Sequence, residues 1–346
     1  MISINFSSGE HNEDINKFIR LNSNSLIYND YRYINLIAEH LSANFHWIVA
    51  KIGDDIAGAL PFMSKQGPMG CVYNSMAYYG SNGGIIQIDD NINVKEMLLD
   101  KFYELGEKNK ISCATIITNP LEKDQDFYEK NINYDYKDVR IGQITNLTSL
   151  PNNDDFINFF ENPRPRNIRR AIREGISIEK SREGWALDFL YKVHSIEMIA
   201  KGGLAKKKEF FNTLSNFLND NQWNIYIGKL NEKPIAALLL LYNNETVEYF
   251  TPAIINDYRN TQASSLIIYN AMRDAIKNGF KNWNWGGTWI SQDGVYNFKK
   301  KWNAQDFPYY YYVKLYNNDL LNKSNDYLKE KYYGFYTVPF SELYEN

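Results

Sequence analysis

Continuous hydrophobic segments predict two β-hairpins at distant places in the chain. The apolar segment FHWIVAK (residues 45–51) meets an acidic turn and returns as IAGALPFM (56–63). The same pattern recurs where WNIYIGK (223–229) returns as IAALLLLY (235–242). Apolar runs of this length, separated by a short polar turn, are typical of paired strands. The hairpins lie about 180 residues apart, which indicates that one unit is duplicated.

A helix and a strand follow each hairpin. Residues 94–109 and 265–280 place apolar side chains three and four positions apart, which predicts amphipathic helices. Gly279 stands where the second helix should end, because glycine readily adopts the left-handed conformation of a C-cap. Apolar strands are expected at 113–118 and 282–287. We therefore predict an α/β (α+β) fold in which hairpin, strand, helix and strand occur twice.

The repeat divides the chain into two domains of similar build. We place them at residues 1–150 and 151–318, and we expect a polar helix and a tail over 319–346. The first boundary falls in LTSLPNNDD (147–155), a segment of turn-forming residues. A length of 346 residues agrees with two domains that each bury a core.

Composition mainly excludes other classes of protein. Hydrophobic residues make up 44% and charged residues 23%, which is globular composition. The longest apolar run (235–242) is far shorter than the roughly 20 residues of a membrane helix. The first residues lack the features of a signal peptide, so we expect a cytoplasmic protein, including one held peripherally at the inner membrane face. The net charge of −3 confines any nucleic-acid contact to a local patch.

Cysteine and histidine give no metal-binding pattern. Cys71 and Cys113 form no CxxC pair, and the four histidines are widely spaced. We expect the cysteines to be small buried side chains and the protein to bind no metal.

Four segments of the chain carry, in order, motifs of a known family. They are YYGSNGGI (78–85), RPRNIRRAIREGISIEKS (164–181), FLYKVHSIEMIAKGG (189–203) and WNWGGTWISQDGVYNFKKKWNA (283–304). Together they resemble the FemAB-like tandem GNAT (Gcn5-related) acyltransferases, including acyltransferase-like proteins of surface-polysaccharide loci. The resemblance implies two tandem GNAT-like domains, each a mixed central sheet flanked by helices, with the acceptor in the first domain or between the two. The last segment departs from the family pattern at Asn284, Trp285 and Ala304.

The chemistry of acyl transfer indicates a site in the second domain. The acyl carbonyl needs hydrogen-bond donors, and a gap between two parallel strands supplies them. We expect these strands at 246–253 and 282–287. Trp285, Gly286 and Gly287 are expected to contact substrate, because glycine lets a ligand approach the backbone closely. From the residues alone, a strand buried by its aromatic side chains and ended by a glycine turn is the alternative.

Two residues in the closing motif are implied to act in the reaction. In the family pattern Phe298 and Lys299 line the channel where donor and acceptor meet. An ammonium at Lys299 would stabilise the oxyanion or hold a phosphate. From the residues alone, Lys299, Lys300 and Lys301 also fit a basic helix surface.

Arginines form one face of a predicted helix, at Arg166, Arg169, Arg170 and Arg173. Ile168, Ala171 and Ile172 are expected behind them. Such a face fits a nucleotide-sugar pyrophosphate, a lipid-linked phosphate or a tRNA backbone, because arginine binds phosphate bidentately. A solvated face paired with acidic neighbours is the alternative. We take Arg166 and Arg170 as the substrate-binding candidates.

A second candidate segment precedes the 265–280 helix, where CoA-using GNAT enzymes hold a pyrophosphate. Here it contains Arg259, Gln262 and Ser264. Gln262 and Ser264 replace small residues, which disfavours CoA in the usual pose. The activated donor stays open between aminoacyl-tRNA and acyl-CoA, and we expect no tightly bound cofactor.

Two further candidates lie elsewhere. Tyr78, Tyr79, Gly80 and Asn82 suit stacking on a sugar ring, with a glycine-rich turn as the alternative. His194, in the middle of a predicted helix, is a minor candidate for a base, with a buried, satisfied histidine as the alternative.

The resemblance and the residues together predict an enzyme. We expect an acyl or aminoacyl transferase that forms an amide on an amino group of a cell-envelope precursor, either a peptidoglycan peptide or an amino sugar of a surface glycan. Its partners would be that precursor or a nucleotide-sugar as acceptor, with tRNA as one possible donor. The alternatives are a CoA-dependent N-acetyltransferase and a non-catalytic GNAT-fold protein that binds a glycan or nucleotide-sugar.

Overall fold

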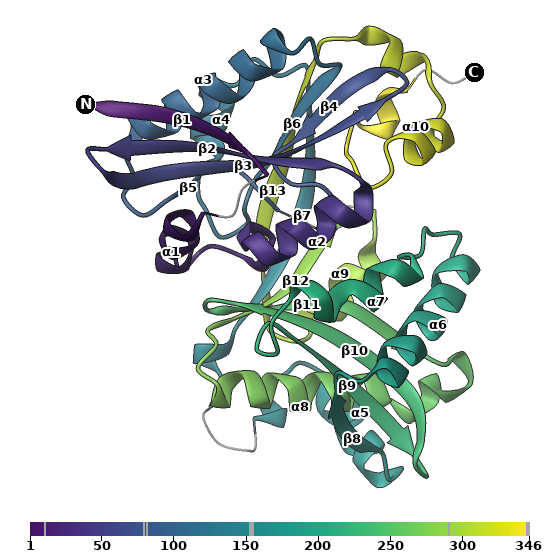
Figure 1. The fold of residues 1–346 in the computed structure, drawn as a ribbon. Helices are drawn as coiled ribbons and strands as arrows, with labels where there is room; N and C mark the ends of the chain where they lie inside the picture. The colour runs from purple at the N-terminus through teal and green to yellow at the C-terminus, as the bar shows by residue number, and fades with distance from the viewer. Residues whose placement is uncertain (10–11, 79, 81, 152–155, 290, 344–346) are drawn as a thin grey trace. The chain divides into compact units, whose positions relative to one another are not determined.

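The computed structural model describes residues 1–346 except 10–11, 79, 81, 152–155, 290 and 344–346. The chain forms two compact units: unit 1 is Met1–Arg140 with Pro308–Asn346, and unit 2 is Ile141–Phe307. These boundaries differ from the sequence prediction because β7 (Tyr136–Asn146) and β13 (Ala304–Leu315) each run from one unit into the other. The last 39 residues therefore group with unit 1 (Figure 1).

The sheet of unit 1 contains one parallel pair among antiparallel neighbours. Its strands, in spatial order, are β1 (Ile2–Ser8), β2 (Asn44–Ile52), β3 (Asp55–Gly67), β4 (Gly70–Asn74), β6 (Cys113–Ile117) and β13. β4 and β6 pair in parallel, and the short β5 (Ile86–Gln87) pairs with β3. Helix α3 (Ile92–Lys108) covers one face, while α1 (Glu13–Leu21) and α2 (Tyr31–Leu41) lie on the other (Figure 1). Helix α4 (Gln125–Asn131) leads towards β7.

Unit 2 repeats this strand order. Its strands are β8 (Ser177–Ser181), β9 (Trp223–Leu230), β10 (Lys233–Asn243), β11 (Thr246–Ile254), β12 (Asn282–Thr288) and β7. The equivalent pair, β11 with β12, is again parallel. The helices are α5 (Arg164–Arg173), α6 (Gly184–Ala200), α7 (Lys208–Phe217), α8 (Ala263–Lys277) and α9 (Asp293–Lys300). The expected mixed α/β class, with one arrangement of strands occurring twice, is confirmed.

Small residues in the repeated hairpins let a helix pack closely on each sheet. A Cβ added at Gly58 of β3 would lie 2.6 Å from Val94 of α3, and one at Gly228 of β9 would lie 3.3 Å from Ile267 of α8. The hairpin strands β2 and β3 are second and third in the sheet of unit 1, as β9 and β10 are in unit 2, so the hairpins found in the sequence hold equivalent places in the two units.

The C-terminal segment differs from the single polar helix and tail expected over 319–346. It forms a short 3-10 helix, η5 (Asn318–Asn322), and then α10 (Asn325–Lys331), whose first turn is capped by Ser324. Leu320, Leu321 and Leu328 are buried against Cys113 and its neighbours. The segment is thus part of the core of unit 1, and Cys113 is a buried side chain as expected.

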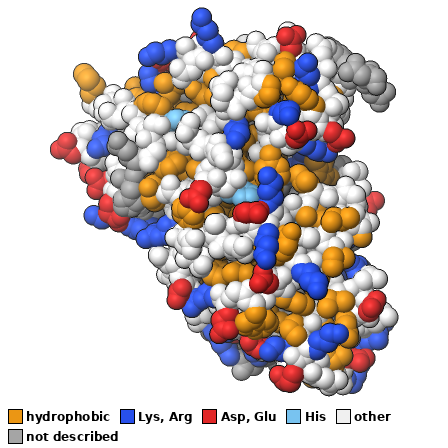
Figure 2. Space-filling model, turned by 45° about the vertical axis from the view of Figure 1, so that its right-hand side comes forward, with side chains coloured by type: hydrophobic (Ala, Val, Ile, Leu, Met, Phe, Trp, Pro, Cys, Tyr) orange, Lys and Arg blue, Asp and Glu red, His pale blue; other side chains and the backbone are white. Residues whose placement is uncertain are grey.

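The surface carries both signs of charge. On the face in Figure 2, basic and acidic side chains lie interspersed, in keeping with the small net charge. No helix in the described part of the chain is long and apolar enough to cross a membrane.

Candidate functional site

The parallel strands of unit 2 separate partway along their length. β11 and β12 pair only from Thr246 to Glu248 and from Asn282 to Asn284. Beyond this point β11 continues beside β10 alone, and the pairing between β10 and β11 shifts register at Leu239 and Leu240. β12 likewise shifts register against β7 between Asn284 and Gly287. Among the described residues β11 and β12 therefore do not pair with each other beyond Glu248 and Asn284.

Asn284 fixes the point where the strands part. Its amide donates to Glu248 Oε1 at 3.2 Å, and its Oδ1 accepts from the Gly286 backbone N–H at 2.9 Å. Both Glu248 and Asn284 are buried. An aspartate here would place two carboxylates side by side in the interior, so the departure from the family pattern has a physical reason.

Lys299 lies behind the glycine pair of β12. Its Nζ is 3.0 Å from Gly286 O, 3.2 Å from Gly287 O and 2.8 Å from Thr288 Oγ1. The side chain is only 5% exposed, so Lys299 is not part of a basic helix surface. Burial lowers the pKa of its amine to about 7. Its neighbour Lys300 is exposed and lies 3.6 Å from Asp306.

The Lys299 amine is therefore bonded to the turn that follows the strand gap. All three of its hydrogen bonds go to protein acceptors, and two of these are carbonyls of the turn that follows the strand gap. Gly286 has φ +71°, a left-handed conformation that favours glycine. A cation at this turn keeps the backbone in that conformation.

Trp285 and Phe298 occupy the core rather than an open channel. Trp285 is 2% exposed, and its indole N–H donates to Thr145 Oγ1 at 2.9 Å. Its ring packs against Trp302 and Phe298. Phe298 in turn lies under the guanidinium of Arg164, 4.5 Å from the ring centroid. The expectation that the Trp285 side chain contacts substrate is wrong for this structure, because the alternation along β12 turns it inward.

The arginine face of α5 and the segment before α8 line one cavity. It has a volume of about 560 Å³ and is lined by Arg166, Asn167, Arg170, Arg173, Glu174 and Gln262. Three arginines against one glutamate make it positive, which suits a phosphate. Ile172 was expected behind the arginines but is 52% exposed.

The segment before α8 places its residues in different surroundings. Gln262 is the N-cap of α8, has φ +62° and gives the first turn no side-chain hydrogen bond. Its amide donates to Arg259 O, while the Arg259 guanidinium pairs with Glu197. Ser264 follows on the first turn of α8. Only Gln262 of the three lines the cavity.

His194 on α6 is buried within unit 2. Its Nε2 accepts from the Lys206 backbone N–H at 3.3 Å. Burial, with the charges of Lys206 and Lys201, lowers the pKa of the imidazole to about 4. At neutral pH the ring is uncharged, as in the satisfied buried histidine that the sequence left as an alternative.

In the glycine-rich loop of the first domain, the side chains of Tyr78 and Asn82 are buried. Tyr78 is 4% exposed and packs against His40, and Asn82 is 3% exposed with its amide on Thr118 O at 3.1 Å. The sequence analysis expected these residues to stack on a sugar ring, but both side chains are buried in this structure. Gly80 has φ +76°, and Tyr79 lies outside the described residues.

Two residues that join this site were not found from the sequence. The Thr288 hydroxyl accepts a hydrogen bond from Lys299 Nζ. It also donates to Gln143 Oε1 of β7 at 3.3 Å, and Gln143 Nε2 donates to Tyr296 O at 3.2 Å. Gln143 comes from a strand more than a hundred residues away, so no local motif could indicate it. The described residues contain no cluster of histidine, cysteine, aspartate or glutamate that could hold a metal ion.

Comparisons with solved structures show where this fold occurs. A structure of FemX matches with a TM-score of 0.72 at 15% identity, over 88% of this chain and 96% of that one. A tandem GNAT protein from the clavulanic acid biosynthesis pathway matches with a TM-score of 0.52 at 8% identity, over 91% and 99%. L-PGS from Bacillus licheniformis matches with a TM-score of 0.51 at 12% identity, over 82% and 91%. At these identities the likeness is one of fold.

Sequence comparison narrows the likeness to one part of the chain. No curated protein matches it. The FemAB family model matches residues 221–329, from just before β9 into α10, and so confirms over that segment the FemAB resemblance that the sequence motifs indicated.

Proposed function

We propose that the protein is an acyl or aminoacyl transferase that forms an amide on an amino group of a cell-envelope precursor. The observation that carries this proposal is the open gap between β11 and β12, bordered by Gly286 and Gly287 and backed by the buried Lys299. A gap of this kind presents fixed backbone dipoles to a carbonyl without any cost of reorganisation during the reaction. The match to the FemAB family model over the segment that contains these residues supports it.

The reaction joins an amine to an activated acyl group without a covalent enzyme intermediate. The amine nitrogen attacks the carbonyl carbon, a C–N bond forms, and the ester or thioester bond to the donor breaks. The nitrogen loses one proton and the leaving oxygen or sulfur gains one. The protein's part is to hold both groups in line and to stabilise the negative charge that develops on the carbonyl oxygen. Lys299 contributes a nearby positive charge and a fixed Gly286–Gly287 turn.

The arginine-lined cavity of unit 2 is proposed as the site of the donor's phosphates. Arg166, Arg170 and Arg173 present guanidinium groups, and Gln262 at the start of α8 completes the wall. Aminoacyl-tRNA and acyl-CoA both bring phosphates to such a site. The bulk of Gln262 and its anchoring to Arg259 O favour a donor that does not lay its pyrophosphate across this turn.

A transfer assay with matched donors and acceptors tests the proposal. Purified protein would be mixed with aminoacyl-tRNA or acetyl-CoA, and with a peptidoglycan stem-peptide precursor or a UDP-linked amino sugar. Mass spectrometry should show one acceptor amine gaining the acyl group from one of the donors. Transfer from acetyl-CoA would select the CoA-dependent alternative. Acceptor binding without transfer from either donor would overturn the proposal in favour of a non-catalytic binding protein.

A further inference from the structure

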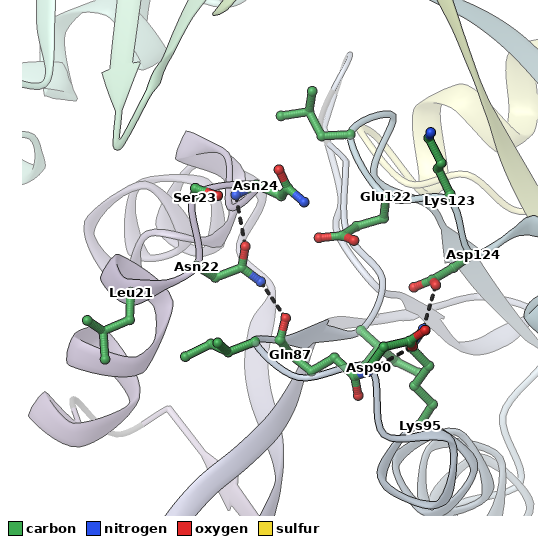
Figure 3. Close-up of a pocket in the computed structure, with 13 residues that line it drawn as sticks. Leu21, Asn22, Ser23, Asn24, Gln87, Asp90, Lys95, Glu122, Lys123 and Asp124 are labelled. Atoms are coloured by element: carbon green, nitrogen blue, oxygen red, sulfur yellow. Dashed lines mark hydrogen bonds and ion pairs between the residues drawn. The ribbon is translucent and has the colours of Figure 1, made fainter. Parts of the chain in front are cut away.

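A second cavity lies entirely within unit 1. It has a volume of about 460 Å³, in the range of small-molecule sites. Three segments form its wall: the end of α1 and the residues after it, β5 with the residues that lead into α3, and the loop at 121–124 before α4. Figure 3 shows Asn22, Asn24 and Gln87 on one side of it and Glu122 and Asp124 on the other. None of its residues takes part in the transferase site proposed for unit 2.

Two of the hydrogen-bond donors that line this pocket, on Lys95 and Asn22, are already used by the protein. The Lys95 ammonium lies 2.6 Å from Asp90 Oδ1 and 2.5 Å from Asp124 Oδ1, and the lysine is 5% exposed. The Asn22 amide donates to the Gln87 backbone carbonyl at 2.9 Å. In contrast, Gln87 Oε1 is buried with no donor among the described residues. The wall is therefore rich in acceptors and short of donors.

Among the acceptors that line the pocket, the Glu122 carboxylate is the one best suited to bind a cation. Its carboxylate is partly buried and turns towards the middle of the pocket, while the Lys123 side chain beside it points away (Figure 3). The part of the chain that the structure describes gives Glu122 no ion pair within 4 Å. Burial raises the pKa of its carboxyl, and the nearby charges of Asp124 and Asp90 raise it too, while the Asn24 hydrogen bond and the Lys95 charge lower it in part. A bound cation would relieve both the burial and the repulsion.

We propose that this pocket binds a primary ammonium group carried by a polar small molecule, with the Glu122 carboxylate as its counter-ion. The ammonium supplies the donors that the wall lacks. Leu21 and Ile88, which are 73% and 52% exposed, border the opening and contact the carbon skeleton of the ligand. The amine can come from an amino sugar or from a lysine side chain, since both place an ammonium on a polar frame.

Calorimetric titration with two pairs of compounds tests the proposal without any acyl donor. Glucosamine would be compared with N-acetylglucosamine, and Nα-acetyl-lysinamide with its Nε-acetylated form. We expect at least one of the amines to bind. Its acetylated counterpart should bind at least about tenfold more weakly, because acetylation removes the charge. The pair that responds identifies the source of the amine.

Variants assign the binding to Glu122. Glu122→Gln keeps the size of the side chain and should weaken binding of the amine about tenfold, while the exposed Asp126→Asn on the nearby helix α4 should leave it unchanged. Circular dichroism checks that both variants are folded. Equal binding of amine and acetylated compound, full binding by Glu122→Gln, or no heat with either amine at tens of millimolar would each overturn the proposal. None of these results depends on whether the protein proves to be a transferase.

Discussion

Units 1 and 2 share a strand order but treat the end of their parallel pair differently. In unit 2 the strands β11 and β12 part after Glu248 and Asn284. In unit 1 the chain leaving β4 bridges the equivalent place. The Ser75 backbone N–H donates to Thr115 O at 2.9 Å, and the Ser75 hydroxyl accepts from the Ile117 N–H at 2.8 Å. Gly83 N–H then donates to Ile117 O at 2.9 Å, so unit 1 fills its own gap.

The helices that follow the hairpins also differ, in how their first turns are capped. The first turn of α3 in unit 1 is capped by Asn91, whose side chain accepts from the N–H groups of Asn93 and Val94. The corresponding helix of unit 2, α8, begins at Gln262 without a side-chain cap and beside three arginines. Unit 1 thus bridges its strand gap and caps its helix with the Asn91 side chain. In unit 2 the strands part, and the start of α8 has a hydrogen bond at 3.3 Å from the Ala263 N–H to Thr261 Oγ1. The duplicated fold therefore places the proposed chemistry in one copy.

The largest expected effect concerns Lys299, which backs the open gap. Lys299→Met should lower kcat about a hundredfold, the size typical of losing one charge-stabilising group. The same change leaves the carbonyls of Gly286 and Gly287 without their donor, at a cost of about 1–3 kcal/mol in stability. Initial rates with the active donor and acceptor, measured on protein shown to be folded, give the result.

A matched variant separates this role from general basic character. Lys300→Met removes an exposed charge next in sequence, so its kcat should stay close to that of the wild type. If both variants lose activity equally, the lysines merely attract an anionic substrate. An unchanged rate in Lys299→Met would remove Lys299 from the reaction.

The buried amine also predicts a pH dependence of stability. The unfolded lysine keeps its proton up to a pKa near 10.4, while the folded one loses it at about 7. Between these values the unfolded state binds more protons, so the free energy of unfolding should rise with pH by up to about 1.4 kcal/mol per pH unit, relative to Lys299→Met. Urea denaturation at pH 7, 8 and 9 measures this difference. If the free energy of unfolding changed with pH equally in the wild type and in Lys299→Met, the pKa of Lys299 would not be lowered by folding.

The filled gap of unit 1 predicts a loss of stability rather than of binding. Ser75→Ala removes the partner of the buried Ile117 N–H and should cost about 1–3 kcal/mol. The KM values for donor and acceptor should not change if unit 1 only fills its own gap here. A raised KM with unchanged stability would mean that this end of β4 contacts a substrate, and the contrast between the units would fail.

The positive cavity of unit 2 predicts weaker donor binding when its charges are removed. Arg166→Gln with Arg170→Gln should raise the KM for the donor about tenfold and leave kcat nearly unchanged, with a reduced dependence on salt. Arg169→Gln is the matched control, because Arg169 bonds to Asn158 and does not line the cavity. An equal effect of all three arginines would indicate long-range attraction only.

Local sequence patterns predict the helices and strands of this fold, but not which of the candidate site residues are buried. The paired hairpins, the strand at 282–287 and the end of α8 near Gly279 follow from apolar spacing and glycine. The burial of Lys299, Trp285 and Tyr78 does not, because each depends on partners brought from distant segments. A basic run and a tyrosine-glycine loop are typical of exposed sites, and here tertiary packing overrides that local character. Likewise Gln143 could be placed beside Thr288 only once the pairing of β7 with β12 was known.

The smallest effect is expected at His194, in the unit that carries the chemistry. Because burial keeps its pKa at about 4, the imidazole is neutral across pH 5.5 to 8 and gives no charge to the reaction there. Its acceptor role towards the Lys206 N–H can be kept by a side-chain amide oxygen. His194→Gln should therefore change kcat by less than about threefold and leave the pH profile of kcat/KM unaltered in shape. If the kcat/KM profile of His194→Gln instead lost its dependence on one ionisation in this pH range, His194 would be a proton-transfer group. Unit 2 would then contain a general base as well as a buried lysine.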